Sequence, residues 1–303
     1  MSCLSPRMGR QIREELEAGW ENERAKGECR VAASRMNAGF AWIDAHIHLD
    51  AYRDDERDGL LQHAAAAGME AVVAVSMNLE SCRATRQLAL AWPGQVMPAY
   101  GYHPEQAVPD EAQTERLTAW IRERHQAGER FAIGEVGLPY YRRTEAAAAG
   151  ERFDEQPYLQ LLERFIRLAA ELDRPVVLHA VYEDAAKACD MLERCGVRRA
   201  HFHWFKGPAE TVARMAAAGY YVSITPDVRY EAEIQALVRQ YPLTQLMVET
   251  DGPWPFEGQY AGRRTTPAMA ADVVAEIAAL KGQPLPETAA VLLQGTKAFY
   301  GIG

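Results

Sequence analysis

The sequence carries histidines and carboxylates at the ends of five short apolar segments that lie far apart along the chain. These segments are 43–48, 132–135, 176–179, 201–203 and 246–251, and each is followed by a predicted loop and helix. Imidazole and carboxylate groups are ligands that Zn²⁺, Mn²⁺ and similar ions accept. A parallel β/α barrel gathers such distant residues at the carboxyl ends of its strands. The pattern therefore predicts a metal site at the mouth of a barrel.

The placement of the histidines supports one shared site. His46 and His48 are two residues apart on a predicted strand, so their side chains point to the same face. His201 and His203 share a face for the same reason and compete for one ligand position. Burying many imidazoles without partners is costly, which favours a shared site over separate hydrogen-bonded core histidines. The histidines in or just after predicted strands are His46, His48, His103, His179, His201 and His203.

Predicted strands and helices alternate from residue 41 onward. The strands are short and rich in Val and Ile, as expected for parallel strands buried on both faces. This alternation favours a closed α/β barrel, a TIM (β/α)8 barrel, over an open doubly wound sheet. We expect strands near 41–48, 70–77, 96–102, 131–137, 175–180, 199–205, 220–226 and 244–250. We expect helices near 55–68, 80–92, 111–127, 156–172, 184–195, 208–218, 230–240, 267–281 and 287–299.

Two segments do not fit this alternation. Residues 1–40 are charged and lack an apolar stripe, so they are predicted to be a helical or partly disordered extension before a barrel domain at 41–303. Met36 is an alternative start of translation. The stretch 140–157 is predicted to be a long loop, which is typical either of a substrate lid or of a surface insertion.

Composition excludes several classes of protein. The net charge of -9 argues against a broad basic surface for nucleic acid, although it allows a small basic patch. The five cysteines are scattered and odd in number, which suits a reducing cytoplasm better than a secreted disulfide framework. No apolar run approaches the roughly 20 residues that span a bilayer. We therefore expect a cytoplasmic protein that has no membrane partner.

Six motifs, in chain order, resemble those of the TatD family of metal-dependent hydrolases, which is of the amidohydrolase type. They are IDAHIHLD (43–50), GYHP (101–104), IGEVGL (133–138), PVVLH (175–179), HWFKG (203–207) and VETDGP (248–253). The resemblance covers residues 42–303. It implies a TIM barrel with a two-metal centre, and a hydrolase activity that is often described as deoxyribonuclease.

The resemblance also implies roles for individual residues. His46 and His48 would hold the first divalent ion, and His179 and His203 the second. Zn²⁺, Mn²⁺ and Mg²⁺ are the candidate ions, since imidazole suits the first two and a nuclease role the third. The implied metal ligands are His46, His48, Glu135, His179, His203 and Asp251.

Two of these ligands, Glu135 and Asp251, would be catalytic. Glu135 would bridge the ions and offset their mutual repulsion. Asp251 would complete the first site and take the proton of the attacking water. His103 would face the leaving or phosphoryl group of the substrate.

The chain departs from the family pattern at positions that concern the substrate. It has Pro139 where an aspartate is usual and Val181 where an arginine is usual. Ala261 and Thr265 replace a usual arginine and asparagine. The missing arginine at 181 matters most, because a guanidinium is well suited to binding a phosphate.

Other residues next to the predicted ligands could contact the substrate. Lys206 and Arg264 could supply the missing positive charge, or could be solvated surface residues. Trp204 and Trp254 could stack on nucleobases, or could line a pocket for a small ester or amide. The predicted substrate contacts are His103, Trp204, Lys206, Trp254 and Arg264.

Three functions are consistent with the sequence. The first is a TatD-like hydrolase of DNA phosphodiester bonds that acts as a 3′-to-5′ exonuclease. The second is an amidohydrolase-type enzyme that cleaves a small amide, lactone or phosphotriester at the same centre. The third is a barrel that retains its metal but has no catalytic activity; the presence of all six ligand positions argues against it.

Overall fold

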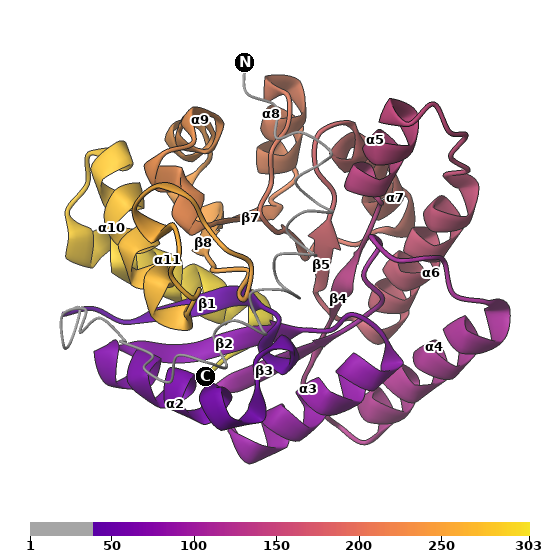
Figure 1. The fold of residues 1–303 in the computed structure, drawn as a ribbon, viewed down its shortest axis with the longest axis horizontal. Helices are drawn as coiled ribbons and strands as arrows, with labels where there is room; N and C mark the ends of the chain where they lie inside the picture. Colours follow the sequence, from indigo (N-terminus) through magenta and orange to yellow (C-terminus); the bar gives the residue numbers. More distant parts are fainter. Residues whose placement is uncertain (1–38) are drawn as a thin grey trace.

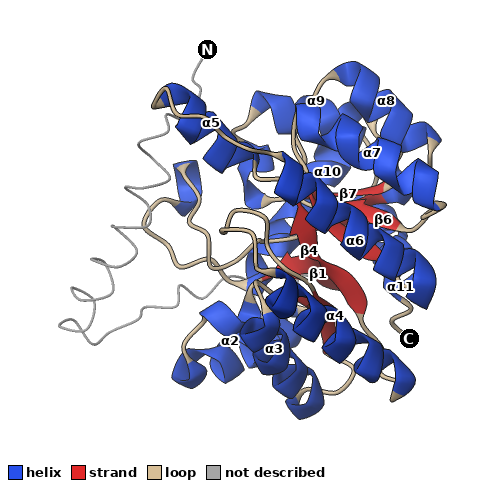
Figure 2. Ribbon diagram, turned by 90° about the vertical axis from the view of Figure 1, so that its right-hand side faces the viewer, coloured by secondary structure: helices blue, strands red, loops and turns tan. Residues whose placement is uncertain are grey.

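The computed structural model describes residues 39–303, whose strands close into a parallel barrel. Each strand pairs with the next along the chain, and β8 pairs with β1 to close the ring. Helices surround the strands (Figures 1 and 2), which confirms the predicted TIM barrel. The strands are β1 (Trp42–Ile47), β2 (Met69–Val75), β3 (Val96–Tyr100), β4 (Ala132–Gly137), β5 (Val176–His179), β6 (Ala200–Phe202), β7 (Tyr221–Ile224) and β8 (Leu246–Val248).

The helices lie where the sequence predicts them, with one addition. The predicted loop at 140–157 contains a helix, α5, so the expectation of a loop throughout this stretch was wrong. The helices are α2 (Asp54–Ala67), α3 (Leu79–Ala91), α4 (Glu111–Gln126), α5 (Tyr140–Ala148), α6 (Gln156–Leu172), α7 (Glu183–Cys195), α8 (Ala209–Ala217), α9 (Ala232–Gln240), α10 (Ala270–Lys281) and α11 (Leu285–Tyr300).

Two features stabilise helix α5, one in its own sequence and one in a distant residue. Its last turn falls in the alanine run 146–149, and alanine has the highest helix propensity. Its first turn is capped by a residue distant in sequence, because the carboxylate of Glu105 accepts the backbone N–H groups of Tyr141 and Arg142. The sequence of residues 140–157 alone does not reveal this cap, because Glu105 lies outside the segment.

Two apolar clusters separate the outside of the barrel from its interior. The larger cluster joins one face of the strands to the surrounding helices. The smaller cluster contains the alternate strand residues Ile43, Ala45, Val73 and others, and it is closed by Phe299 and Tyr300 at the end of α11. The smaller cluster therefore fills the barrel below the carboxyl ends of the strands.

Irregularities in two strands change which residues face the interior. Ile43 and Ala45 point inward, and strict alternation would then turn His46 and His48 outward. The β1–β2 register shifts between Asp44 and Ile47, so that Ile47 faces the helices instead. The β4–β5 register shifts in the same way between residues 133 and 136, on either side of Glu135. Such irregularities re-aim side chains, here toward the mouth of the barrel.

Two further predictions concern the N-terminal extension and the absence of a membrane-spanning segment. The proposed extension at 1–40 lies almost wholly outside the described residues, so its separation from a domain at 41–303 stays a prediction. Among the helices of residues 39–303, none is both long and apolar enough to cross a bilayer.

The close approach of β4 and β5 gives a test of the fold. A Cβ atom on Gly137 would lie 1.8 Å from the carbonyl oxygen of His179, so Gly137→Ala must move the backbone of one strand. We expect a loss of about 3 kcal/mol in the free energy of unfolding, measured by urea denaturation. Gly59→Ala is the control, because an added Cβ at this helical position meets nothing within 4 Å. The control should be neutral or stabilising; equal losses in both variants would contradict the close approach.

Candidate metal centre

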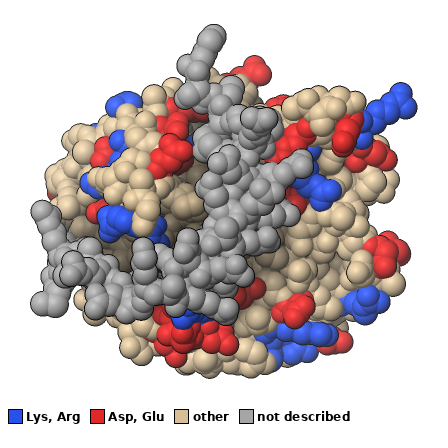
Figure 3. Space-filling model, viewed as in Figure 1, with Lys and Arg blue, Asp and Glu red and all other residues tan. Residues whose placement is uncertain are grey.

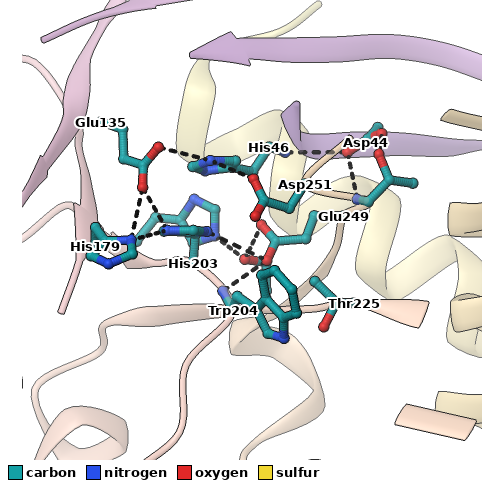
Figure 4. A network of polar contacts seen from close by, with 12 residues as sticks. Asp44, His46, Glu135, His179, His203, Trp204, Thr225, Glu249 and Asp251 are labelled. Carbon is teal, nitrogen blue, oxygen red and sulfur yellow. Dashed lines mark hydrogen bonds and ion pairs between the residues drawn. The ribbon is translucent and has the colours of Figure 1, made fainter. Parts of the chain in front are cut away.

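The six predicted ligands lie together at the mouth of the barrel, in or shortly after five different strands. Figure 4 shows five of them, which are His46, Glu135, His179, His203 and Asp251. Among the described residues, four overlapping groups of three have potential ligand atoms within 4.8 Å of one another, and two of these groups together contain all six predicted ligands. Each of the six residues is at most 8% exposed. These two groups are His46, His48 and Asp251, and Glu135, His179 and His203.

Glu135 lies between the two groups and directs one oxygen at each. Its Oε2 atom is 3.2 Å from Nε2 of His46 and 3.3 Å from Nε2 of His48. Its Oε1 atom is 2.7 Å from Nε2 of His203 and 3.0 Å from Nδ1 of His179. This division of the two oxygens is the geometry that a bridging carboxylate requires.

The first group suits a cation better than it suits internal hydrogen bonds. Oδ1 of Asp251 is 3.3 Å from Nε2 of His46 and 3.4 Å from Nε2 of His48. Ligands about 2.1 Å from a tetrahedral Zn²⁺ ion are about 3.4 Å apart, so these separations fit the edges of such a site. Nε2 of His46, Oε2 of Glu135 and Oδ1 of Asp251 are buried without a hydrogen-bond partner. Buried polar atoms are nearly always partnered, so their convergence fits a cation.

The two acidic ligands remain ionised despite complete burial. Burial raises the pKa of Glu135, but electrostatic interactions with the surrounding imidazoles, His103 foremost, hold it well below its usual range. Burial also opposes the charge of Asp251, while the nearby imidazoles of His46 and His48 lower its pKa. The buried carboxylates of Glu135 and Asp251 can therefore balance the positive charge of a bound group.

In the absence of metal, protons on the imidazoles supply part of that balance. Burial opposes the charge of His48, but the carboxylates of Asp251 and Glu135 beside it raise its pKa to about 9. Burial also opposes the charge of His179, and hydrogen bonds to Glu105 and Glu135 raise its pKa to about 10. Burial lowers the pKa of His203 to about 4, so this ring stays neutral. Metal binding would displace the protons, because a coordinating imidazole is neutral.

His103 lies at the same centre with a defined tautomer. Its Nδ1 atom accepts the backbone N–H of Glu105 at 3.2 Å, so the proton of the neutral ring is on Nε2. Nε2 in turn lies 3.2 Å from Oε1 of Glu135. The imidazole therefore presents a donor to the centre.

Three further carboxylates support the predicted ligands, of which Asp44 and Glu249 are fully buried and Glu105 is partly exposed. Asp44 accepts the backbone N–H of Thr250 at 3.0 Å and so holds the segment that ends in Asp251. Glu249 accepts the backbone N–H of Trp204 at 2.7 Å, and burial raises its pKa to about 8. Glu105 lies 3.4 Å from Nε2 of His179. The only sequence signal was their position within two residues of a predicted site residue.

His201 does not lie among the predicted ligands at the mouth of the barrel. It contacts Ser223, which in turn contacts Glu249. It is fully buried, with Nδ1 2.6 Å from the hydroxyl of Tyr300 and Nε2 2.6 Å from that of Ser223. Ser223 also donates to Glu249 at 2.5 Å. A chain of polar contacts thus runs from the end of α11 to the centre, and it leaves His201 unable to face a substrate.

The predicted substrate contacts other than His103 differ in their local partners and exposure. The indole N–H of Trp204 donates to Asp227 at 2.7 Å, and Nζ of Lys206 lies 3.8 Å from the same carboxylate. Trp254 is 40% exposed. The guanidinium of Arg264 is paired with Glu56 at 3.1 Å and is therefore partly neutralised.

Local structure accounts for three of the four positions that depart from the family pattern, and nothing in the described structure explains Ala261. Val181 is 3% exposed, so its side chain is packed and does not stand open to a ligand. Pro139 directly precedes the first turn of α5. The hydroxyl of Thr265 donates to the carbonyl of Trp254, and its own carbonyl accepts the hydroxyl of Tyr52 at 2.9 Å. Thr265 therefore supports the loop that carries Trp254.

Comparison with known proteins places this barrel in a family. The family model described as "TatD related DNase" matches residues 43–301, and the chain belongs to this family of metal-dependent hydrolases. An uncharacterized metal-dependent hydrolase of Haemophilus influenzae is 36% identical over 85% of this chain and 98% of its own length. Human deoxyribonuclease TATDN3 is 34% identical over 71% of this chain and 79% of its own.

A solved structure agrees with that assignment. The crystal structure of the TatD homolog YjjV from Escherichia coli is similar to this chain, with a TM-score of 0.72 and 26% sequence identity. The match covers 86% of this chain and 98% of that one. The family resemblance predicted from the six motifs is therefore confirmed.

The raised pKa values predict how pH affects the metal-free protein. Folding raises the pKa of His48 from 6.5 to about 9 and the pKa of His179 from 6.5 to about 10. The stability that these two groups contribute is therefore complete below pH 6.5 and is lost as the pH rises through the two folded-state values. The free energy of unfolding of chelator-treated protein should therefore fall between pH 7 and pH 10, as measured by urea denaturation at each pH. The double variant His48→Asn/His179→Asn should show a shallower fall. A wild-type free energy that stays constant or rises over this interval would contradict the assignment.

Proposed function

We propose that the protein binds two divalent cations and hydrolyses phosphodiester bonds in DNA. The observation that carries the proposal is the division of the Glu135 oxygens between two groups of buried ligand atoms. A site for a single ion would not need a carboxylate whose two oxygens face different groups of ligand atoms. The family and the deoxyribonuclease name of the human relative support DNA as the substrate.

The ligand roles follow from the two groups. His46 and His48 would hold one ion together with Asp251, and His179 and His203 would hold the other. Glu135 would contact both. Zn²⁺ and Mn²⁺ suit the imidazole-rich set best, while Mg²⁺ prefers oxygen ligands.

When bound, the two cations would lower the pKa of water and balance the charge on the attacking and leaving oxygens. Asp251 would accept the proton of the attacking water, because its lowered pKa keeps it ionised. His103 would donate a hydrogen bond from Nε2 toward the phosphoryl group or the leaving oxygen. Lys206 would add positive charge beside the aromatic ring of Trp204.

Basic and acidic side chains are mixed over the face seen in Figure 3, on the part that the described residues form. A protein that neutralises few phosphates loses little affinity as salt increases. Cytoplasmic placement, which would give access to DNA, stays a prediction.

A second function is supported by one specific observation. At Val181, where the family usually has an arginine, the side chain is packed and uncharged. A centre without that guanidinium could act on a small lactone, amide or phosphotriester, as the amidohydrolase type does. Turnover of such a substrate by metal-loaded protein that leaves 3′-labelled single-stranded DNA intact would favour this alternative.

The proton-accepting role of Asp251 gives the test of the leading proposal. Asp251→Asn should lower kcat on 3′-labelled single-stranded DNA by about 10²–10⁴-fold, because an amide cannot accept the proton of water. Glu135→Gln should lower the bound metal from two ions per chain, as measured by elemental analysis. Asp190→Asn is the matched control, since Asp190 pairs with Arg214 on the exposed surface of α7. Undiminished activity in Asp251→Asn would overturn the assigned role.

A further inference from the structure

Exposed aromatic side chains are concentrated where the strands end. The large hydrophobic side chains that are exposed among the described residues are Leu90, Tyr141, Tyr230 and Trp254. The three aromatic ones follow β4, β7 and β8, whereas Leu90 lies at the end of α3. Exposed aromatic rings beside an active site are candidates for binding a flat substrate group.

The ring of Tyr141 lies beside one of the proposed metal ligands, His179. Its ring centre is 6.0 Å from that of His179, with the planes at 63°, and 5.4 Å from that of Tyr140, with the planes at 88°. Neither neighbour stacks in parallel on Tyr141, and the residue is 50% exposed. Its ring therefore remains available to a planar group that enters the mouth of the barrel.

The backbone that carries Tyr141 is tied directly to the centre. Oε1 of Glu105 accepts the N–H of Tyr141 at 2.9 Å, and Oε2 accepts the N–H of Arg142 at 2.9 Å. The same Oε1 atom lies 3.4 Å from Nε2 of His179. One carboxylate thus fixes both a proposed metal ligand and the first turn of α5.

Ion pairs hold the opposite side of the same turn. The guanidinium of Arg143 donates to Asp184 at 2.8 Å and to Glu183 at 2.7 Å, both in the first turn of α7. Asp184 is fully buried, so this contact is shielded from solvent. The ring of Tyr141 is therefore exposed on a backbone that is anchored at both sides, and a ligand that stacks on it need not order the loop first.

We propose that Tyr141 is a substrate-binding residue that stacks on the nucleobase of the nucleotide next to the cleaved phosphodiester, and that Glu105 is its positioning residue. The inference rests on the proposed function and adds a base-binding position to it. Stacking on an aromatic ring accepts every base, because each base has a flat face. The site would therefore recognise that a base is present without selecting which one.

The test compares two oligonucleotides, one intact and one with an abasic residue at the terminal nucleotide. On the intact oligonucleotide, Tyr141→Ala should lower kcat/KM by about 5- to 100-fold, chiefly through KM, whereas Tyr141→Phe should retain most of it. On the abasic oligonucleotide, the wild type should lose a similar factor and Tyr141→Ala should lose no more. Glu105→Gln should raise KM on the intact oligonucleotide more than on the abasic one.

Two controls separate this role from damage to the centre. Leu90→Ala, at the 57% exposed position on α3, should match the wild type on both oligonucleotides. The metal content of the Tyr141 variants should equal that of the wild type. Equal losses for Tyr141→Ala on both oligonucleotides would overturn the stacking role while the wild-type cleavage upholds the proposed function. A wild type that cleaves neither oligonucleotide would overturn the proposed function, and the stacking role with it.

Discussion

The negative charge of Glu135 is the constraint on which the rest of this structure depends. The carboxylate is fully buried. One of its oxygens faces the imidazoles of His46 and His48 at the end of β1, and the other faces those of His179 and His203, which follow other strands. An unpaired buried charge would be expensive, so something positive must lie between it and the rings. Without metal, protons on His48 and His179 serve this purpose, and two divalent ions would serve it better. The buried Glu135 carboxylate thus needs positive charge beside it in the folded protein.

The barrel meets this constraint through small deviations from regular structure. The register shifts in β1 and β4 occur at the strands that provide His46, His48 and Glu135. Below them, the apolar interior and the aromatic end of α11 close the barrel. Beside them, Asp44, Glu249 and Glu105 hold the segments that carry the ligands. The mouth is therefore polar and specifically arranged, while the interior beneath it is apolar.

Much of this arrangement could be predicted from the sequence. The apolar, β-branched strands and the six ordered motifs predicted the barrel and the residues that converge at its mouth. The direction of His46 and His48 could not be derived from alternation, because Ile43 and Ala45 already occupy the inward face and a register shift intervenes. Helix α5 was missed because its cap, Glu105, comes from the loop after β3. The inward position of His201 depends on Tyr300, 99 residues away, which no local pattern reveals.

The central claim is that Glu135 bridges two cations. Anomalous diffraction from crystals of this protein grown with excess Mn²⁺ tests it most directly. The account predicts two peaks about 3.5–4 Å apart, one on each side of the Glu135 carboxylate, with His46, His48 and Asp251 at one peak and His179 and His203 at the other. A single peak bound by only one of the two groups, or no peak at the mouth of the barrel, would contradict it.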